Sequence, residues 1–320
     1  IWHDSFKIVV INSFNSKWMR GICEQFLIPY LSILYSCDFI FMPSTFGLFI
    51  PIKKVITFVH TNTSFKMDRN LRGRSNLQQL AHNIHIKITS LTSSILLFTS
   101  ETTKKEYIKF NKNALYKKSF VIGNGLNIER DKSGNLQPVE FLKNKKFLLS
   151  VSQIYRLKNF DSLIKAFLKV SSNNSIFNDI FLVIVGTIQE YEYFNELKTL
   201  AQSSKNIIFL HNLLDEEMNW LYRNCDTYIF LSLFEGYSLT PAEAICSGKD
   251  VIISDIEVHR EIYKNVANFV NPLSINSISK IIKSRTDENY KIDNIKKKNF
   301  INSFSLEKFI TNLYKIILNA

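Results

Sequence analysis

The sequence predicts an α/β protein built from two doubly wound domains that face each other across a cleft. Short runs of β-branched and aromatic residues alternate with longer amphipathic runs, which is the pattern of parallel sheets flanked by helices. The pattern occurs twice, and the polar, non-periodic segment 127–138 separates the two series. A chain of 320 residues is also long enough to form two cores of ordinary domain size.

The first series is expected to form an N-terminal domain at residues 1–126. Its strands are expected at residues 6–12, 38–43, 55–60, 95–100 and 119–123. Helical patterns lie between them at residues 20–35, 76–88 and 101–111.

The second series is expected to form a C-terminal domain at residues 146–303, after a linker at 127–145. Its strands are expected at residues 146–152, 180–186, 206–211, 226–232, 251–255 and 267–270. Helices are expected at residues 160–170, 191–202, 216–224, 241–247, 275–283 and 306–318. We expect the terminal segment 304–320 to pack back on the N-terminal domain.

Composition narrows the class of protein. Apolar residues make up 46% of the chain and charged residues 21%, as in folded proteins rather than disordered ones. The four cysteines are scattered without a CxxC pair, which argues against a zinc site or a disulfide framework and indicates a reducing compartment. The most apolar segment, residues 25–52, is split by Asp38 and broken by Pro29 and Pro43. This favours a core helix and a buried strand over a membrane span.

The net charge of +12 is concentrated in the first part of the chain. Residues 1–125 carry 16 Lys or Arg and 6 Asp or Glu, whereas the remaining residues carry 24 and 22. The excess can be a solvated surface, or it can attract anionic lipid headgroups or nucleic acid. No nucleic-acid-binding motif accompanies it. We therefore expect peripheral contact with an anionic membrane or acceptor, and no nucleic-acid partner.

The segment after the strand expected at 226–232 carries most of the functional information. Thr240 is expected to be the N-cap of the following helix, with Pro241 at the first helical position and Glu243 completing a capping box. Glu235 and Glu243 therefore bracket a glycine turn at a helix start, where free N–H groups attract phosphate. In open α/β sheets ligands bind at the carboxyl ends of strands. The segment predicts a nucleotide-sugar site.

Four segments match a known family in order and spacing: residues 150–159, 183–186, 207–211 and 235–248. On these segments the C-terminal half resembles glycosyltransferase family 4, the glycosyl transferases group 1. Members of this family adopt the GT-B fold of two facing Rossmann-like domains. A Glu-x7-Glu pattern alone is weak, but here Lys-Asn also follows the first strand of the domain.

The resemblance implies a role for each matching residue. Lys158 is implied as the cation at the donor phosphates, Glu235 as the carboxylate that contacts the transferred sugar, and Glu243 as the ligand of the ribose hydroxyls. Because Gln153 stands where the family often has arginine, Arg156 is the candidate for that missing charge. The implied catalytic set is Glu235, Lys158, Arg156 and His60, and the implied donor-binding set is Glu243, Gly236, Tyr237, Ser238, Leu239 and Thr240.

Each candidate also has a purely structural alternative. Lys158 can be a surface lysine at a helix start, and Arg156 can point to solvent. Glu235 can be a solvated loop charge, and Glu243 can cap its own helix. His60 can be a strand-end histidine bonded to a neighbouring carbonyl.

The resemblance implies a retaining, metal-independent glycosyltransferase that uses a nucleotide-diphosphate sugar and no cofactor. The implied acceptor is a saccharide or lipid-linked saccharide in surface polysaccharide synthesis. The expected location is the cytoplasm, at the inner face of the membrane. A sugar phosphorylase, a nucleotide-sugar epimerase, a non-catalytic scaffold subunit and a nucleic-acid-binding protein stay open as alternatives. Relatives begin with a strand and a glycine-rich loop; no such loop is found here, so we expect the N-terminal domain to lack them.

Overall fold

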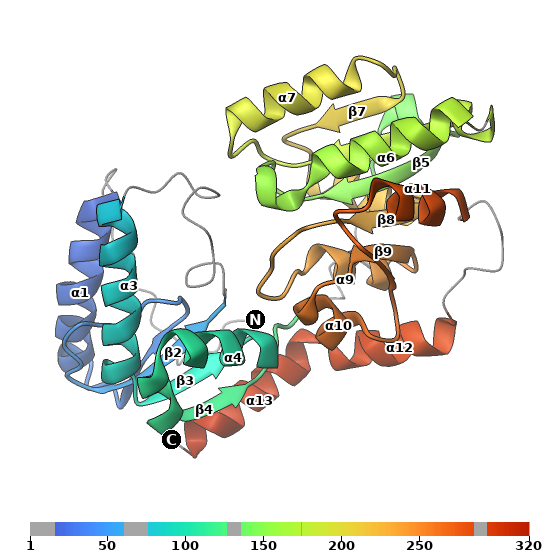
Figure 1. Cartoon of the computed structure of the whole chain (residues 1–320). Helices are drawn as coiled ribbons and strands as arrows, with labels where there is room; N and C mark the ends of the chain where they lie inside the picture. The colour runs from blue at the N-terminus through green and yellow to red at the C-terminus, as the bar shows by residue number, and fades with distance from the viewer. Residues whose placement is uncertain (1–16, 61–75, 127–135, 174, 285–292, 320) are drawn as a thin grey trace.

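The computed structural model describes residues 17–60, 76–126, 136–173, 175–284 and 293–319. Within these residues the chain forms two separate sheets, each covered by helices (Figure 1). The predicted α/β architecture with two parallel sheets is confirmed. The strand expected at residues 6–12 and the first part of the expected linker, residues 127–135, lie outside the described residues.

The N-terminal sheet has four parallel strands in chain order: β1 (Phe39–Met42), β2 (Lys54–Val59), β3 (Ile95–Phe98) and β4 (Lys118–Val121). Its helices are α1 (Lys17–Leu34), α3 (Asn76–Thr92) and α4 (Glu101–Phe110). All four strands lie close to the positions that the runs of β-branched and aromatic residues predict. Helix α3 extends four residues beyond its predicted end.

Alternation along β2 shows how this sheet buries both faces. Val55 and Val59 pack in clusters with residues of α1, α3 and α4. Ile56 and Phe58 point to the other face, where they contact apolar side chains of α13 (Leu306–Leu318). The C-terminal helix of the chain therefore covers one face of the N-terminal sheet, and Figure 1 shows it in red alongside β4.

The second sheet has six parallel strands: β5 (Lys146–Val151), β6 (Ile180–Val185), β7 (Ile207–Leu210), β8 (Thr227–Phe230), β9 (Asp250–Ser254) and β10 (Asn268–Val270). Their spatial order is β7-β6-β5-β8-β9-β10. The order reverses between β5 and β8, so this pair forms the switch point at which doubly wound sheets bind ligands.

Helices cover both faces of this sheet. One core includes residues of α6 (Phe160–Asn173), α7 (Tyr191–Ala201) and α11 (Ile275–Lys283). The opposite core includes residues of α8 (Asp215–Asn224), α9 (Thr240–Cys246), α10 (Glu257–Tyr263) and α12 (Asn294–Ser303). Helices α10 and α12 were not expected from the sequence.

The two halves join where α12 gives way to α13. Leu126 and Ser305 form a β-bridge, and the Leu126 amide donates to the Phe304 carbonyl at 2.9 Å. Gly125 lies beneath this crossing, where an added Cβ would be 2.7 Å from the Leu306 Cα. The domain limits predicted from the sequence stay a prediction. Among the described helices, none combines the length and hydropathy needed to cross a bilayer.

Candidate active site

Two loops meet at the carboxyl edge of the six-stranded sheet because β5 and β8 are neighbours there. They are the β5–α6 loop (residues 152–159) and the β8–α9 loop (residues 231–239). The amide of Leu233 donates to the carbonyl of Leu157 at 2.8 Å, and the hydroxyl of Ser232 donates to the same oxygen at 3.1 Å. These bonds hold the two loops in fixed register.

Lys158 and Glu235 form a direct ion pair across the two loops. Their side chains are only 10% and 13% exposed, so the pair is largely withdrawn from water. Burial alone would lower the pKa of Lys158, but the adjacent Glu235 carboxylate and the Tyr155 hydroxyl together outweigh it, and the pKa is raised. Asn159, with a left-handed φ of 57°, ends the turn and donates its side-chain amide to the Pro272 carbonyl at 2.8 Å. The ammonium is therefore charged and held in place.

The β8–α9 loop is strained at Ser238, whose φ of 74° lies in the left-handed region that favours glycine. His259 of α10 is fully buried and lies beside it. Burial lowers the pKa of His259 to about 4, so its ring is neutral. Its Nδ1–H donates to the Ser254 carbonyl at 3.0 Å, which leaves Nε2 to accept from the Ser238 hydroxyl at 3.1 Å. Tyr263 also donates its hydroxyl to the Ser238 carbonyl.

Helix α9 begins one residue earlier than predicted, and the predicted capping box is wrong. Leu239 occupies the N-cap position without a side-chain cap, and Thr240 is the first helical residue. The reason is competition from buried tyrosines. Thr240 hydrogen-bonds Tyr228, and Glu243 accepts a hydrogen bond from the Tyr222 hydroxyl at 2.6 Å. A hydrogen bond from Tyr222 of α8 therefore holds Glu243.

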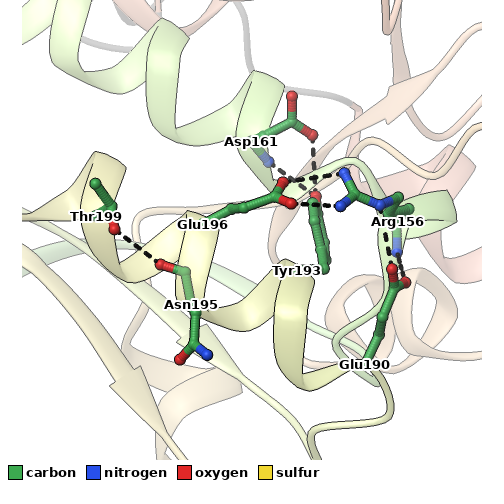
Figure 2. A network of polar contacts seen from close by, with 7 residues as sticks. All are labelled: Arg156, Asp161, Glu190, Tyr193, Asn195, Glu196 and Thr199. Carbon is green, nitrogen blue, oxygen red and sulfur yellow. Dashed lines mark hydrogen bonds and ion pairs between the residues drawn. The ribbon is translucent and has the colours of Figure 1, made fainter.

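Arg156 binds two carboxylates other than Glu235, those of Glu190 and Glu196 (Figure 2). Its Nε and backbone N–H donate to Glu190, each at 3.1 Å, and both of its terminal nitrogens donate to Glu196. Its guanidinium also lies 5.2 Å from the Tyr193 ring centroid. A role at donor phosphates would require Arg156 to leave both carboxylates.

Tyr237 lies at the boundary between the two halves. It stacks on Phe304, and burial raises its pKa to about 12. An added Cβ at Gly123, which has a φ of +71°, would lie 2.9 Å from the Tyr237 hydroxyl.

His60 follows β2, and its ring packs on Phe58 of that strand at 4.1 Å between centroids. Burial lowers the pKa of His60.

Two residues at the site were missed by sequence reasoning. Tyr222 of α8 hydrogen-bonds Glu243, and His259 of α10 hydrogen-bonds Ser238. Tyr222 lies in the helix expected at residues 216–224. A tyrosine on the buried face of a helix needs a hydrogen-bond partner for its hydroxyl, and this need could have pointed to Glu243. His259 lies in an unpredicted helix, so no signal was visible.

A different cavity, of about 860 Å³, opens at the opposite edge of the six-stranded sheet. It is lined by the amino ends of β5, β6 and β8 and by Lys145, Lys205 and Asp226. It contains none of the predicted site residues. In the described part of the chain, no three His, Cys, Asp or Glu side chains are grouped so that they could hold a metal ion.

Comparison with known proteins identifies related sequences. The family model described as Glycosyl transferases group 1 matches residues 132–301, just over half of the chain. The O-antigen chain mannosyltransferase RfbU of Salmonella typhimurium is 28% identical over 178 residues, which cover 55% of this chain and 46% of that protein. The chain thus spans less than half the length of the curated relatives it matches.

Solved structures share the fold across most of the chain. A glycosyltransferase from Rickettsia africae aligns with a TM-score of 0.70 at 18% identity and covers 96% of this chain and 83% of its own. Anabaena HepE, solved with UDP and glucose, aligns with a TM-score of 0.67 at 16% identity over 84% of this chain and 72% of its own. The GT-B fold predicted from the sequence is confirmed.

Proposed function

Because the chain belongs to the glycosyl transferases group 1 family, we propose that it transfers a sugar from a nucleotide-diphosphate donor to a saccharide or lipid-linked saccharide acceptor. The reaction proceeds with retention of anomeric configuration and without a metal or cofactor. The observation that carries the proposal is the Lys158–Glu235 pair at the β5/β8 switch point, with Glu243 at the start of the helix that follows.

The charge of Lys158 suits the leaving group. When the bond between C1 of the sugar and the diphosphate oxygen breaks, negative charge grows on the diphosphate, and a preorganised ammonium stabilises it. The acceptor hydroxyl forms the new bond to C1 on the same face, and its proton passes to the departing diphosphate. Glu235 contacts the transferred sugar, and Glu243 binds the ribose hydroxyls.

Before donor binds, Glu235 already neutralises Lys158. When the donor binds, its diphosphate therefore replaces the Glu235 carboxylate as the anionic partner of Lys158. This exchange releases Glu235 toward the sugar at the moment when the donor arrives. It also keeps a largely buried ammonium paired in both states, which avoids the cost of an isolated buried charge.

The names of relatives narrow the substrates to test first. RfbU is named as an O-antigen chain mannosyltransferase, which supports a mannosyl donor and a surface-polysaccharide acceptor. HepE was solved with UDP and glucose, which supports a nucleoside-diphosphate hexose in general. The basic excess in residues 1–125 supports an anionic, lipid-linked acceptor at the inner face of the cytoplasmic membrane.

Two assays test the proposal. Thermal shifts with UDP, GDP, dTDP and ADP identify the base, because ligand that binds only the folded state raises its melting temperature. Transfer is then measured with the matching hexose donors, mannosyl donors first, with and without saccharide and lipid-linked acceptors. We expect product only with acceptor, and a loss of at least about 100-fold in Lys158→Met.

Lys165→Met is the matched control, because Lys165 pairs with Asp161 on the exposed surface of α6. Donor turnover without acceptor would instead indicate an epimerase. Failure to bind any of the four nucleotides would indicate a scaffold subunit.

A further inference from the structure

The corner between β3 and α4 in the N-terminal half touches the β8–α9 loop of the other half. Three hydroxyls of this corner point at one atom, the carbonyl oxygen of Gly236. The Thr99, Ser100 and Thr103 hydroxyl oxygens lie 3.3, 3.2 and 3.0 Å from it. The Ser100 hydroxyl oxygen also lies 2.8 Å from Thr103 Oγ1, so its single hydrogen is shared between that oxygen and the carbonyl, and Thr103 makes the shortest contact with the carbonyl. Gly236 is buried, so its carbonyl needs these donors in place of water.

The same corner is fastened a second time by a carboxylate of α10. Glu261 accepts hydrogen bonds from the backbone N–H groups of Glu101 and Thr102 at 2.6 and 2.8 Å, and from the Thr102 hydroxyl at 2.6 Å. This places a negative charge at the N-terminus of α4, where the helix dipole favours it. The first turn of α4 is thereby held against the C-terminal half at the point where α4 and α10 meet (Figure 1).

We propose that Thr103, together with Thr99 and Ser100, positions Glu235 for sugar transfer by holding the neighbouring Gly236 carbonyl. Gly236 follows Glu235 directly, so a peptide unit anchored at its carbonyl restricts the backbone that carries the carboxylate. Glu261 keeps the corner in register. The N-terminal half therefore completes the geometry of a site whose charged residues named above, Lys158, Glu235 and Glu243, belong to the other half.

This inference rests on the proposed function for its catalytic consequence but not for its structural one. The side chains assigned to the nucleotide are Lys158 and Glu243, and neither contacts the corner through these bonds. The bonds end on the Gly236 carbonyl, so the backbone next to Glu235 is the first part of the site that they restrict. Loss of these hydrogen bonds should thus lower the rate of transfer while the affinity for the nucleoside diphosphate stays unchanged, which a general loss of folding stability would not produce.

The test compares Thr103→Val, which removes only the hydroxyl, with Thr103→Ser, which restores it. Thr89→Val is the matched control, since Thr89 is an equally buried threonine of the same half whose hydroxyl accepts from Gly47 N at 2.9 Å. Amide hydrogen exchange of peptides covering residues 234–240 is measured without substrate. We expect Thr103→Val to speed exchange there by about tenfold, and Thr103→Ser and Thr89→Val to match the wild type. Wild-type exchange in Thr103→Val would overturn the inference.

Steady-state kinetics supply the second readout. We expect kcat to fall about tenfold in Thr103→Val, with nucleoside-diphosphate affinity within about twofold of wild type and recovery in Thr103→Ser. An equal loss of affinity, or no recovery in Thr103→Ser, would count against positioning. If the wild type transfers no sugar, the proposed function fails, and the exchange experiment still decides whether the corner holds the loop.

Discussion

The two members of the Lys158–Glu235 pair should affect nucleotide binding in opposite ways. Loss of the Glu235 charge should strengthen binding, and loss of the Lys158 charge should weaken it. The two side chains are 10% and 13% exposed, so loss of one partner leaves a largely buried charge without compensation. Such a loss costs about 3–5 kcal/mol in buried pairs, and the residual exposure favours the lower value. In Glu235→Gln the uncompensated group is the Lys158 ammonium, which an incoming diphosphate can neutralise.

The expected change in affinity follows from that energy. If diphosphate binding recovers about half of the penalty in Glu235→Gln, roughly 1.5 kcal/mol, the nucleoside diphosphate binds about tenfold more tightly than to the wild type. In Lys158→Met the cation itself is absent, so binding should weaken by at least about tenfold. Without ligand, both variants should lose a similar free energy of unfolding. With the nucleoside diphosphate present, their affinities should change in opposite directions.

Isothermal titration of the best nucleoside diphosphate into wild type and both variants measures this divergence. Lys165→Met again serves as the control, because its exposed ion pair contributes little. Urea unfolding without ligand measures the shared loss of stability. The reasoning is refuted if Glu235→Gln binds no more tightly than wild type, or if Lys158→Met binds normally.

Three further predictions concern the surroundings of the site. Tyr222→Phe removes one hydrogen bond to Glu243 and should reduce the preference for a ribonucleoside diphosphate over its 2′-deoxy form by about fivefold, whereas Tyr228→Phe should not; competition binding with both nucleotides checks this. The pKa of His259 is about 4 when folded against an ordinary 6.5, so the unfolded state binds more protons and stability is lost as pH falls from 6.5 to 4. Urea unfolding at pH 7 and pH 4 should show that wild type loses about 3 kcal/mol more than His259→Gln. Gly125→Ala places a Cβ 2.7 Å from the backbone of α13; it should cost about 1–3 kcal/mol and speed amide exchange in that helix, and normal protection there would contradict the packing.

The sequence predicted that Lys158, Glu235 and Glu243 converge on one crevice. That prediction came from the resemblance to the family and from the rule that ligands bind at the carboxyl ends of strands in open α/β sheets. The ion pair between Lys158 and Glu235 was not predicted; it follows from the pairing of β5 with β8. Glu243 was expected on the first turn of a helix from the local Thr-Pro-x-Glu pattern, and it lies in the first turn of α9.

Partners set by distant side chains could not be predicted in this way. The ion pairs of Arg156 with Glu190 and Glu196 join two consecutive βα units, and nothing in the local sequence marks them. The capping box failed because Tyr228 and Tyr222 engage Thr240 and Glu243. The propensity of a residue to cap a helix depends on its neighbours in sequence. Here hydrogen bonds from distant tyrosines outweigh that propensity.

The two unpredicted helices show a second limit. Helix α10 has only seven residues, and α12 has no clear apolar face because a run of lysines interrupts it. One of those lysines, Lys297, is buried and pairs with Asp250 at 2.8 Å. From the sequence alone, a lysine is assigned to the solvent face of a helix. Because Lys297 instead lies on the buried face, the sequence shows no apolar periodicity that would predict α12.

The location of a bound nucleoside diphosphate tests the central claim most directly. A structure determined by diffraction from crystals soaked with the nucleotide selected by thermal shift should show the diphosphate within hydrogen-bonding distance of Lys158 Nζ and the ribose hydroxyls at Glu243, with Glu235 released from the ammonium. A nucleotide held instead in the cavity at the amino ends of β5, β6 and β8, beside Lys145 and Lys205, would contradict the account.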